Sequence, residues 1–261
     1  MNAMRLQRKI LAWYSAHKRD LPWRKTIDPY KILISEVMLQ QTQVDRVIPY
    51  YDRFLKKYPS VYALSKARNR TLLKLWSGLG YNSRALRLKT LAKIIVKRHN
   101  GKFPRIAEEL TALPGIGPYT AHAIMAFAHD KEVPVLDTNI RRVLIHELGL
   151  PHTTSTMALM KIAQAMIPKG KSRTWHNALM DYGALQTTAR STGVKSLSKQ
   201  KQFLGSDRWL RGQILKEVLK KRRVTVSELH ATIDHPRTQI VLGILLREGI
   251  IRKKGRFLFI A

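Results

Sequence analysis

Apolar residues recur at helical spacing along most of the chain, and short polar stretches or stretches containing Gly and Pro separate them. Between residues 5 and 18, for example, Leu6, Ile10, Leu11 and Tyr14 fall close to one face of a helix. The same spacing predicts helices over 30–41, 49–58, 62–77 (one or two helices), 83–99, 106–110, 120–128, 140–148, 157–166, 175–185, 209–220, 225–232 and 236–248. The pattern therefore predicts a chain that is helical almost throughout.

The last part of the chain has a different pattern. Ile250-Ile251 and Phe257–Ile260 flank a basic turn, which predicts a β-hairpin with a charged tip. Three helices followed by such a hairpin resemble a winged helix, a small module that docks on nucleic acid or protein. Residues 187–202 are polar and basic and predict an irregular segment or linker before it.

Gly115 and Gly117 lie two residues apart, between the short helix 106–110 and the apolar helix 120–128. Glycine supplies backbone angles that tight turns need and lets another molecule approach closely. Amides at a helix start can bind an anion such as phosphate, although Pro118 removes one donor. Taken alone, two spaced glycines favour an ordinary helix–helix connection. A monovalent cation bound at this hairpin stays an open alternative.

Net charge changes the picture. The 261 residues include 48 Lys and Arg against 17 Asp and Glu, a formal charge of +31. Such an excess attracts polyanions, and nucleic acid is the leading partner. No apolar run of transmembrane length or signal peptide is evident, so we expect an intracellular protein without a membrane partner. We also expect it to be a cytoplasmic, nucleoid-associated monomer. The chain has no Cys, which excludes disulfides and Cys-ligated metal centres.

Two carboxylates stand out against this basic background. Glu36 interrupts the apolar helix 30–41; it is either on a wet face or buried with a raised pKa. Asp137 precedes Thr138 and Asn139 at the start of the helix 140–148, where a simple helix cap is the alternative to a functional role. His122 and His129 share a helix face, but without further ligands they indicate structural residues rather than a metal site.

Several stretches, in order, carry a family resemblance. Ser35–Val44, with the sequence SEVMLQQTQV, resembles the active-site helix of MutY-type adenine DNA glycosylases. Other matching stretches are Leu75–Tyr81 with Arg84, Leu113–Ala121, Val135–Asn139 and Met180–Ala184. The resemblance runs from about Leu21 to Ala184 and places the chain in the helix–hairpin–helix superfamily, which includes endonuclease III.

The resemblance implies an all-α fold of two helical domains with a DNA-binding cleft between them. One domain would be a six-helix unit over 30–134, and the other would join 1–29 to 135–204. Residues 205–261 would form the winged-helix-like α+β module. Glu36 and Asp137 would then face each other across the cleft.

The resemblance also implies chemistry on double-stranded DNA with a mismatched or damaged pair, whose target base is flipped out of the helix. Glu36 would protonate the departing adenine, and Asp137 would stabilise the sugar cation. Tyr119 stands where lyase-active relatives have Lys, which implies a monofunctional enzyme. The implied DNA contacts are Gln40, Gln41, Thr42, Tyr81, Arg84, Gly115, Gly117, Tyr119 and Asn139.

The chain departs from the family pattern after Ala184. The positions of the family's iron–sulfur ligands correspond to Thr187, Val194, Leu197 and Phe203, none of which binds iron. We therefore expect no cofactor and no metal, and a loop 187–203 closed by packing of Val194, Leu197 and Phe203 on the helix 175–185. That loop would bring Lys195, Lys199 and Lys201 towards DNA.

The identity of the target pair stays open at the level of sequence. Residues 205–261 are too few for the domain that lets many relatives read 8-oxoguanine, so the opposing base is undetermined. A thymine or uracil mismatch glycosylase of the same fold is the nearest alternative. A DNA-binding protein that has lost catalysis is the other, and the presence of both Glu36 and Asp137 argues against it.

Overall fold

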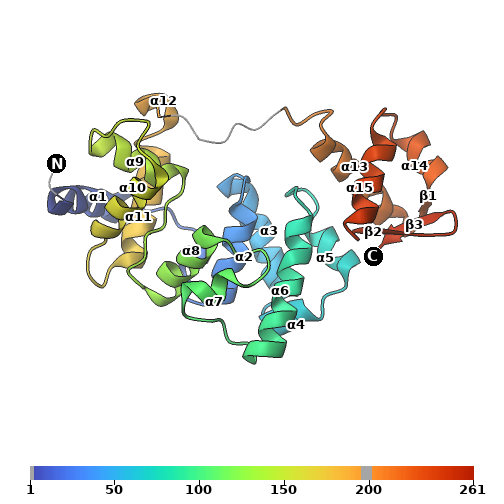
Figure 1. Cartoon of the computed structure of the whole chain (residues 1–261), viewed down its shortest axis with the longest axis horizontal. Helices are drawn as coiled ribbons and strands as arrows, with labels where there is room; N and C mark the ends of the chain where they lie inside the picture. The colour runs from blue at the N-terminus through green and yellow to red at the C-terminus, as the bar shows by residue number, and fades with distance from the viewer. Residues whose placement is uncertain (1–2, 195–201) are drawn as a thin grey trace. The chain divides into compact units, whose positions relative to one another are not determined.

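A computed structural model describes residues 3–194 and 202–261. The described chain is mostly helical and ends in a small antiparallel sheet, which confirms the predicted fold class (Figure 1). None of the helices within these two ranges is both long and apolar enough to cross a membrane.

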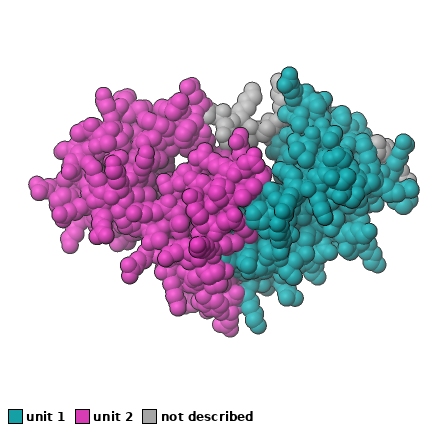
Figure 2. Space-filling view, turned by 180° about the vertical axis from the view of Figure 1, so that it is seen from behind, with its two compact units in different colours: residues 1–37, 102–199 teal, residues 38–101, 200–261 magenta. Residues whose placement is uncertain are grey.

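The chain forms two compact units, each assembled from two separate stretches of sequence. Unit 1 comprises residues 1–37 and 102–199, and unit 2 comprises residues 38–101 and 200–261 (Figure 2). The predicted division into 30–134, 1–29 plus 135–204, and 205–261 stays a prediction.

Unit 1 is built from helices that bury one apolar face each. The elements are α1 (Ala3–His17), the 3₁₀ turn η1 (Pro22–Arg24), most of α2 (Pro29–Leu39), α7 (Ala107–Thr111), α8 (Pro118–His129), α9 (Thr138–Glu147), α10 (Thr156–Ala165), α11 (Ser172–Leu185) and α12 (Ala189–Thr192). A core of Leu6 from α1, Leu144 from α9, Leu159 from α10 and Trp175 from α11 holds four of them together. The segment predicted to be irregular thus contains a short helix, α12, because the Thr188 hydroxyl caps it.

A buried carboxylate ties the chain after α1 to α11. Asp181 accepts hydrogen bonds from Arg24 Nη1 and Nη2 at 2.6 and 2.7 Å and from Arg19 Nε at 2.6 Å. Burial by itself would raise the pKa of Asp181, but the bonds from Arg24 and Arg19 outweigh it and hold that pKa below its ordinary value. The carboxylate therefore stays charged and fixes the entry to α2, on which Glu36 lies.

Unit 2 contains α3 (Val44–Lys57), α4 (Val61–Ser65), α5 (Asn69–Trp76), α6 (Ser83–His99), α13 (Asp207–Lys221), β1 (Val224–Thr225), α14 (Val226–Thr232), α15 (Thr238–Arg247), β2 (Ile251–Lys254) and β3 (Phe257–Ile260). The expected start of α3 at Pro49 is wrong, since the helix begins at Val44 and carries Pro49 inside it. The helix accepts this proline because Val47, Tyr51 and Phe54 bury one continuous face.

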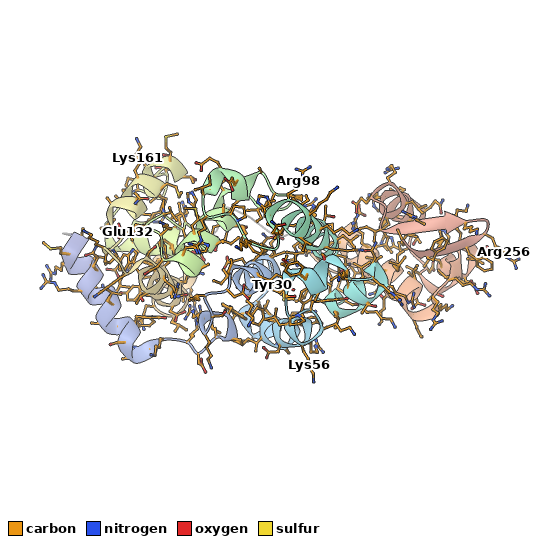
Figure 3. The ribbon with its side chains drawn as sticks, turned by 90° about the horizontal axis from the view of Figure 1, so that it is seen from below. Tyr30, Lys56, Arg98, Glu132, Lys161 and Arg256 are labelled. Atoms are coloured by element: carbon orange, nitrogen blue, oxygen red, sulfur yellow. The ribbon has the colours of Figure 1, made fainter. Side chains whose placement is uncertain are left out.

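The C-terminal part of unit 2 has the element order expected of a winged helix. Strand β3 pairs antiparallel with both β1 and β2, giving the order β1-β3-β2. The strand β1 is an addition to the predicted hairpin; its pairing of Val224 with Leu258 depends on residues distant in sequence. Arg256, in the turn between β2 and β3, projects outward, whereas Tyr30 of α2 lies in the interior (Figure 3).

Candidate active site

Glu36 lies on α2 with only 7% of its surface exposed. The alternative of a wet helix face is therefore wrong, and the carboxyl group is inside the protein. Burial raises the pKa of Glu36 from its ordinary 4.5 to about 7; a hydrogen bond with Tyr119 lowers it, and the nearby Asp137 carboxylate raises it further. A carboxyl group with this pKa can hold a proton near neutral pH.

Tyr119 is the second residue of α8 and comes directly from the glycine hairpin. Burial and the neighbouring carboxylates of Glu36 and Asp137 raise the pKa of Tyr119 well above 10. The phenol therefore stays protonated and donates its hydrogen bond to Glu36. Because a phenol has no amine, Tyr119 cannot form a Schiff base with a sugar or carbonyl carbon.

Asp137 is the N-cap of α9 and belongs to unit 1, as do Glu36 and Tyr119. Its Oδ1 accepts a 2.7 Å hydrogen bond from the Ile140 amide, and its Oδ2 accepts a 3.1 Å bond from Asn139 Nδ2. Burial raises the pKa of Asp137 above its ordinary 3.8, and these donors and the positive charge of Arg142 limit the rise. Asp137 therefore caps α9 and also lies near Glu36.

Arg142 and Gly183, to which sequence analysis gave no role, hold the Asp137 loop in place. Arg142 Nη1 donates to Asn139 Oδ1 at 3.3 Å and to the Gly183 carbonyl at 3.0 Å. Gly183 itself lies against Asn139, because a Cβ there would come within 2.7 Å of Asn139 Cβ and 2.8 Å of its carbonyl oxygen. Gly183 was visible within a matching segment; Arg142 carried no sequence signal. The predicted DNA contact of Asn139 stays a prediction, and its amide is directed at Asp137.

Replacing Gly183 by Ala should therefore lower the free energy of unfolding by about 1–3 kcal/mol through overpacking and displace Asn139 and the neighbouring Asp137. The matched control is Gly212→Ala in α13, where a Cβ meets nothing within 4 Å. That variant should gain up to about 1 kcal/mol from helix propensity. Thermal unfolding of both variants checks the expectation, and equal melting temperatures would contradict it.

In the hairpin between α7 and α8, the two glycines have different roles. Gly115 has φ of +86°, a conformation that favours glycine. Gly117 has an ordinary φ, and a Cβ at this position would meet nothing within 4 Å. The absence of a side chain there lets another molecule approach the backbone closely. Buried Leu113 and Ile116 fasten the turn from below, and the Ile116 amide donates to the Leu113 carbonyl at 3.2 Å. The turn thus presents exposed backbone next to Tyr119.

In unit 2, the predicted DNA contacts gather on two neighbouring loops. The first loop holds Gln40, Gln41 and Thr42, and the second holds Tyr81. Tyr81 Oη donates a 2.5 Å hydrogen bond to Gln41 Oε1.

Arg84 lies buried beneath these two loops. Its Nη1 donates to the Gln40 carbonyl at 2.7 Å, and its Nη2 donates to the carbonyls of Leu79 and Gly80 at 3.2 and 3.1 Å. Burial lowers the pKa of Arg84 to about 10, so the guanidinium stays charged at neutral pH. Arg84 therefore ties the loops together, and its predicted contact with DNA stays a prediction.

The positions that correspond to iron–sulfur ligands offer no thiolate. Thr187 is buried, and its carbonyl accepts a hydrogen bond from Arg142. Val194 is buried, as predicted, and belongs to the same core cluster of unit 1 as Trp175 and Leu179. The predicted burial of Phe203 is wrong: 51% of its surface is exposed, and the Arg208 guanidinium lies 5.1 Å from its ring.

The remaining predictions for this loop concern Leu197, Lys195, Lys199 and Lys201, which lie outside the described residues. Within 3–194 and 202–261, no group of three or more His, Cys, Asp or Glu is placed to hold a metal ion. These residues do not fit a cysteine-ligated cluster, and no step of the chemistry is assigned to one.

The helix–hairpin–helix turn and the buried pair of carboxyl groups beside it define a DNA repair enzyme of the base-excising type. Residues 34–169 match the family described as HhH-GPD superfamily base excision DNA repair protein, and the chain belongs to this superfamily.

Curated relatives agree with this membership. The chain is similar to the adenine DNA glycosylase of Mycolicibacterium smegmatis, with 34% identity over 95% of this chain and 94% of the relative. It is also similar to the adenine DNA glycosylase of Rattus norvegicus, with 39% identity over 77% of this chain but only 43% of that longer protein.

Solved structures extend the comparison. A thermostable thymine-DNA glycosylase has 32% identity and a TM-score of 0.66, with 74% of this chain and 95% of that one covered. An endonuclease III trapped in a covalent intermediate with DNA has 20% identity and a TM-score of 0.63, with 77% and 91% covered, and supports the fold alone.

Proposed function

We propose that this protein is an adenine DNA glycosylase, which removes a mispaired adenine from duplex DNA by hydrolysing the N-glycosidic bond. The observation that carries the proposal is the buried Glu36 carboxyl, with a pKa of about 7, beside Tyr119 and Asp137. The names of its curated relatives support adenine as the target. The exposed hairpin and the +31 charge support binding to the DNA backbone.

Glu36 acts as the general acid in this proposal. The target adenine is flipped out of the base stack so that its glycosidic bond becomes accessible. As that bond breaks, negative charge develops on the departing base, and the Glu36 proton neutralises it. The apolar surroundings of Glu36 keep the proton available near neutral pH, where an ordinary glutamate is ionised.

Asp137 supplies the opposite charge. The sugar becomes cationic as the base leaves, and a carboxylate beside it stabilises that cation or traps it until water attacks. The Ile140 amide and the Asn139 side chain hydrogen-bond to the charged form of Asp137 and orient it. In this proposal the two carboxyl groups divide the work: Glu36 is protonated and Asp137, held by these donors, is ionised.

The enzyme should be monofunctional and leave an intact abasic site, because Tyr119 offers no amine for a Schiff base. Borohydride should fail to trap a covalent complex between the wild-type protein and abasic DNA. The Tyr119→Lys variant should show trapping, since the Lys amine would enter the same buried position. Gel analysis of both proteins with labelled abasic duplex measures this. Strong trapping by the wild type would mean that another amine reaches the sugar.

A thymine mismatch glycosylase is the second candidate, and the similarity to a thymine-DNA glycosylase structure favours it. A panel of duplexes with adenine, thymine or uracil opposite guanine, plus adenine opposite 8-oxoguanine or cytosine, separates the two after alkaline strand cleavage. Breakage at adenine supports the proposal, and breakage at thymine or uracil alone supports the second candidate. Tight binding without any breakage would reject both and indicate a DNA-binding protein without catalysis.

A further inference from the structure

Tyr81 joins two residues from distant parts of unit 2. Arg208, in the first turn of α13, donates from Nη1 to Tyr81 Oη at 2.9 Å, and Tyr81 Oη donates to Gln41 Oε1 at 2.5 Å. The Arg208 guanidinium also lies 5.6 Å from the centre of the Tyr81 ring. The C-terminal module therefore reaches the two loops that carry Gln41 and Tyr81.

The direction of these hydrogen bonds follows from the chemistry of the groups. A guanidinium has only donors, so Tyr81 Oη must accept from Arg208. The single hydroxyl proton of Tyr81 is then directed at Gln41, whose amide must present its oxygen to Tyr81. Arg208 thereby fixes the direction of the hydrogen bond between Tyr81 and Gln41.

The backbone at both residues needs such support. Gln41 has φ of +57° and Tyr81 has φ of +47°, which is the left-handed region that residues with side chains adopt only rarely. Conformations of this kind persist where surrounding contacts hold them, and they are concentrated at binding sites. Arg84 donates hydrogen bonds to backbone carbonyls of both loops, whereas Arg208 donates to the side-chain hydroxyl of Tyr81.

The helix that delivers Arg208 is itself anchored at its other end. Arg70 of α5 donates to the carbonyls of Val218 and Leu219, which lie in the last turn of α13 and would otherwise lack partners. Asn69 Nδ2 adds a 2.6 Å bond to the carbonyl of Ala261. Ten residues of helix, about 15 Å, separate the two ends, so Arg208 is held by a fixed element rather than by a tether.

We propose that Arg208 is a positioning residue for base recognition, which sets the orientation of the Gln41 amide through Tyr81. The winged-helix-like module thereby becomes part of the DNA-reading surface. An amide reads a base edge through its donor and acceptor pattern, so its orientation decides which base it favours. The proposal rests on the proposed function, since Gln41 and Tyr81 are taken to contact DNA beside the target base.

The central experiment compares Arg208→Gln with Arg211→Gln. Both variants remove one positive charge from α13, but Arg211 is paired with Glu248 and not with Tyr81. Both should bind fully paired duplex equally well and melt at similar temperatures. Only Arg208→Gln should reduce the preference for mispaired over fully paired duplex, by about tenfold, and change the ranking of excision rates among opposing bases.

A Tyr81→Phe variant completes the cycle. It removes the hydroxyl that links Arg208 to Gln41, so the double variant Tyr81→Phe/Arg208→Gln should lose no more preference than either single variant. Arg208→Lys, which keeps the charge and a donor, should restore part of the preference. Additive losses, or an Arg208→Gln variant that matches Arg211→Gln in every ratio, would overturn the proposal. The binding preference is measurable without catalysis, so absence of excision by the wild type would reject the proposed function separately.

Discussion

Asp137→Asn should abolish base excision and leave DNA binding nearly unchanged. Asn is as good a helix N-cap as Asp, so α9 should keep its start and the protein its stability. What is lost is the negative charge beside the sugar cation, and the single-turnover rate should fall by a factor of about 10³ or more. Rapid-quench excision and gel-shift affinity on the same mispaired duplex measure the two effects.

The matched control for Asp137→Asn is Ser155→Ala, which removes the side-chain cap of α10 in the same unit. It should cost about 1 kcal/mol of stability while excision proceeds normally. A near-normal rate for Asp137→Asn would show that the charge on this residue is not needed for the reaction. A large loss of excision in Ser155→Ala as well would mean that the excision rate follows the stability of unit 1 rather than the charge on Asp137.

Glu36→Gln should also stop excision, because an amide has no proton to give to the departing base. In the wild type the rate should fall about tenfold per pH unit above pH 7, where Glu36 loses its proton. The residual rate of the variant should lack that dependence. Single-turnover rates from pH 5.5 to 9 provide the measurement, and a wild-type rate for the variant at neutral pH would place the general acid elsewhere.

Tyr119→Phe keeps the Glu36 carboxyl group and changes only its pKa. The hydrogen bond from Tyr119 lowers the pKa of Glu36, so removing it should raise that pKa further. The decline of the excision rate should then move to higher pH. A shift to lower pH would contradict the inferred direction of this hydrogen bond.

Stability should report the same pKa independently of catalysis. The folded-state pKa of Glu36 lies above its ordinary 4.5, at about 7. The wild type therefore loses stability as the pH rises from about 4.5 through about 7, because ionisation becomes unfavourable only in the folded protein. Glu36→Gln should lack this loss and should melt at a higher temperature than the wild type at pH 8.

The order of the helices, the C-terminal β-hairpin and the candidate acid Glu36 could be predicted from the sequence, because the patterns that indicate them are local. Helix periodicity depends on neighbours three and four residues apart, so the order of helices was predictable, as was the β-hairpin at the end. An acid inside an apolar helix is visible without a structure, and Glu36 was identified in this way. The absence of Cys excludes a thiolate-bound cluster wherever the loop lies.

Other features depend on contacts that no local pattern encodes. Only the folded chain decided that Glu36 is buried, that Arg84 lies under two loops, and that Phe203 stays half exposed. Pro49 lies inside α3 because burial of one helix face outweighs the missing hydrogen bond. Tyr81 and Arg208 are 127 residues apart, and their hydrogen bond depends on the packing of α13, which Arg70 contacts at its far end. Sequence thus determined which groups are available, and tertiary packing decided their surroundings, on which their pKa values and roles depend.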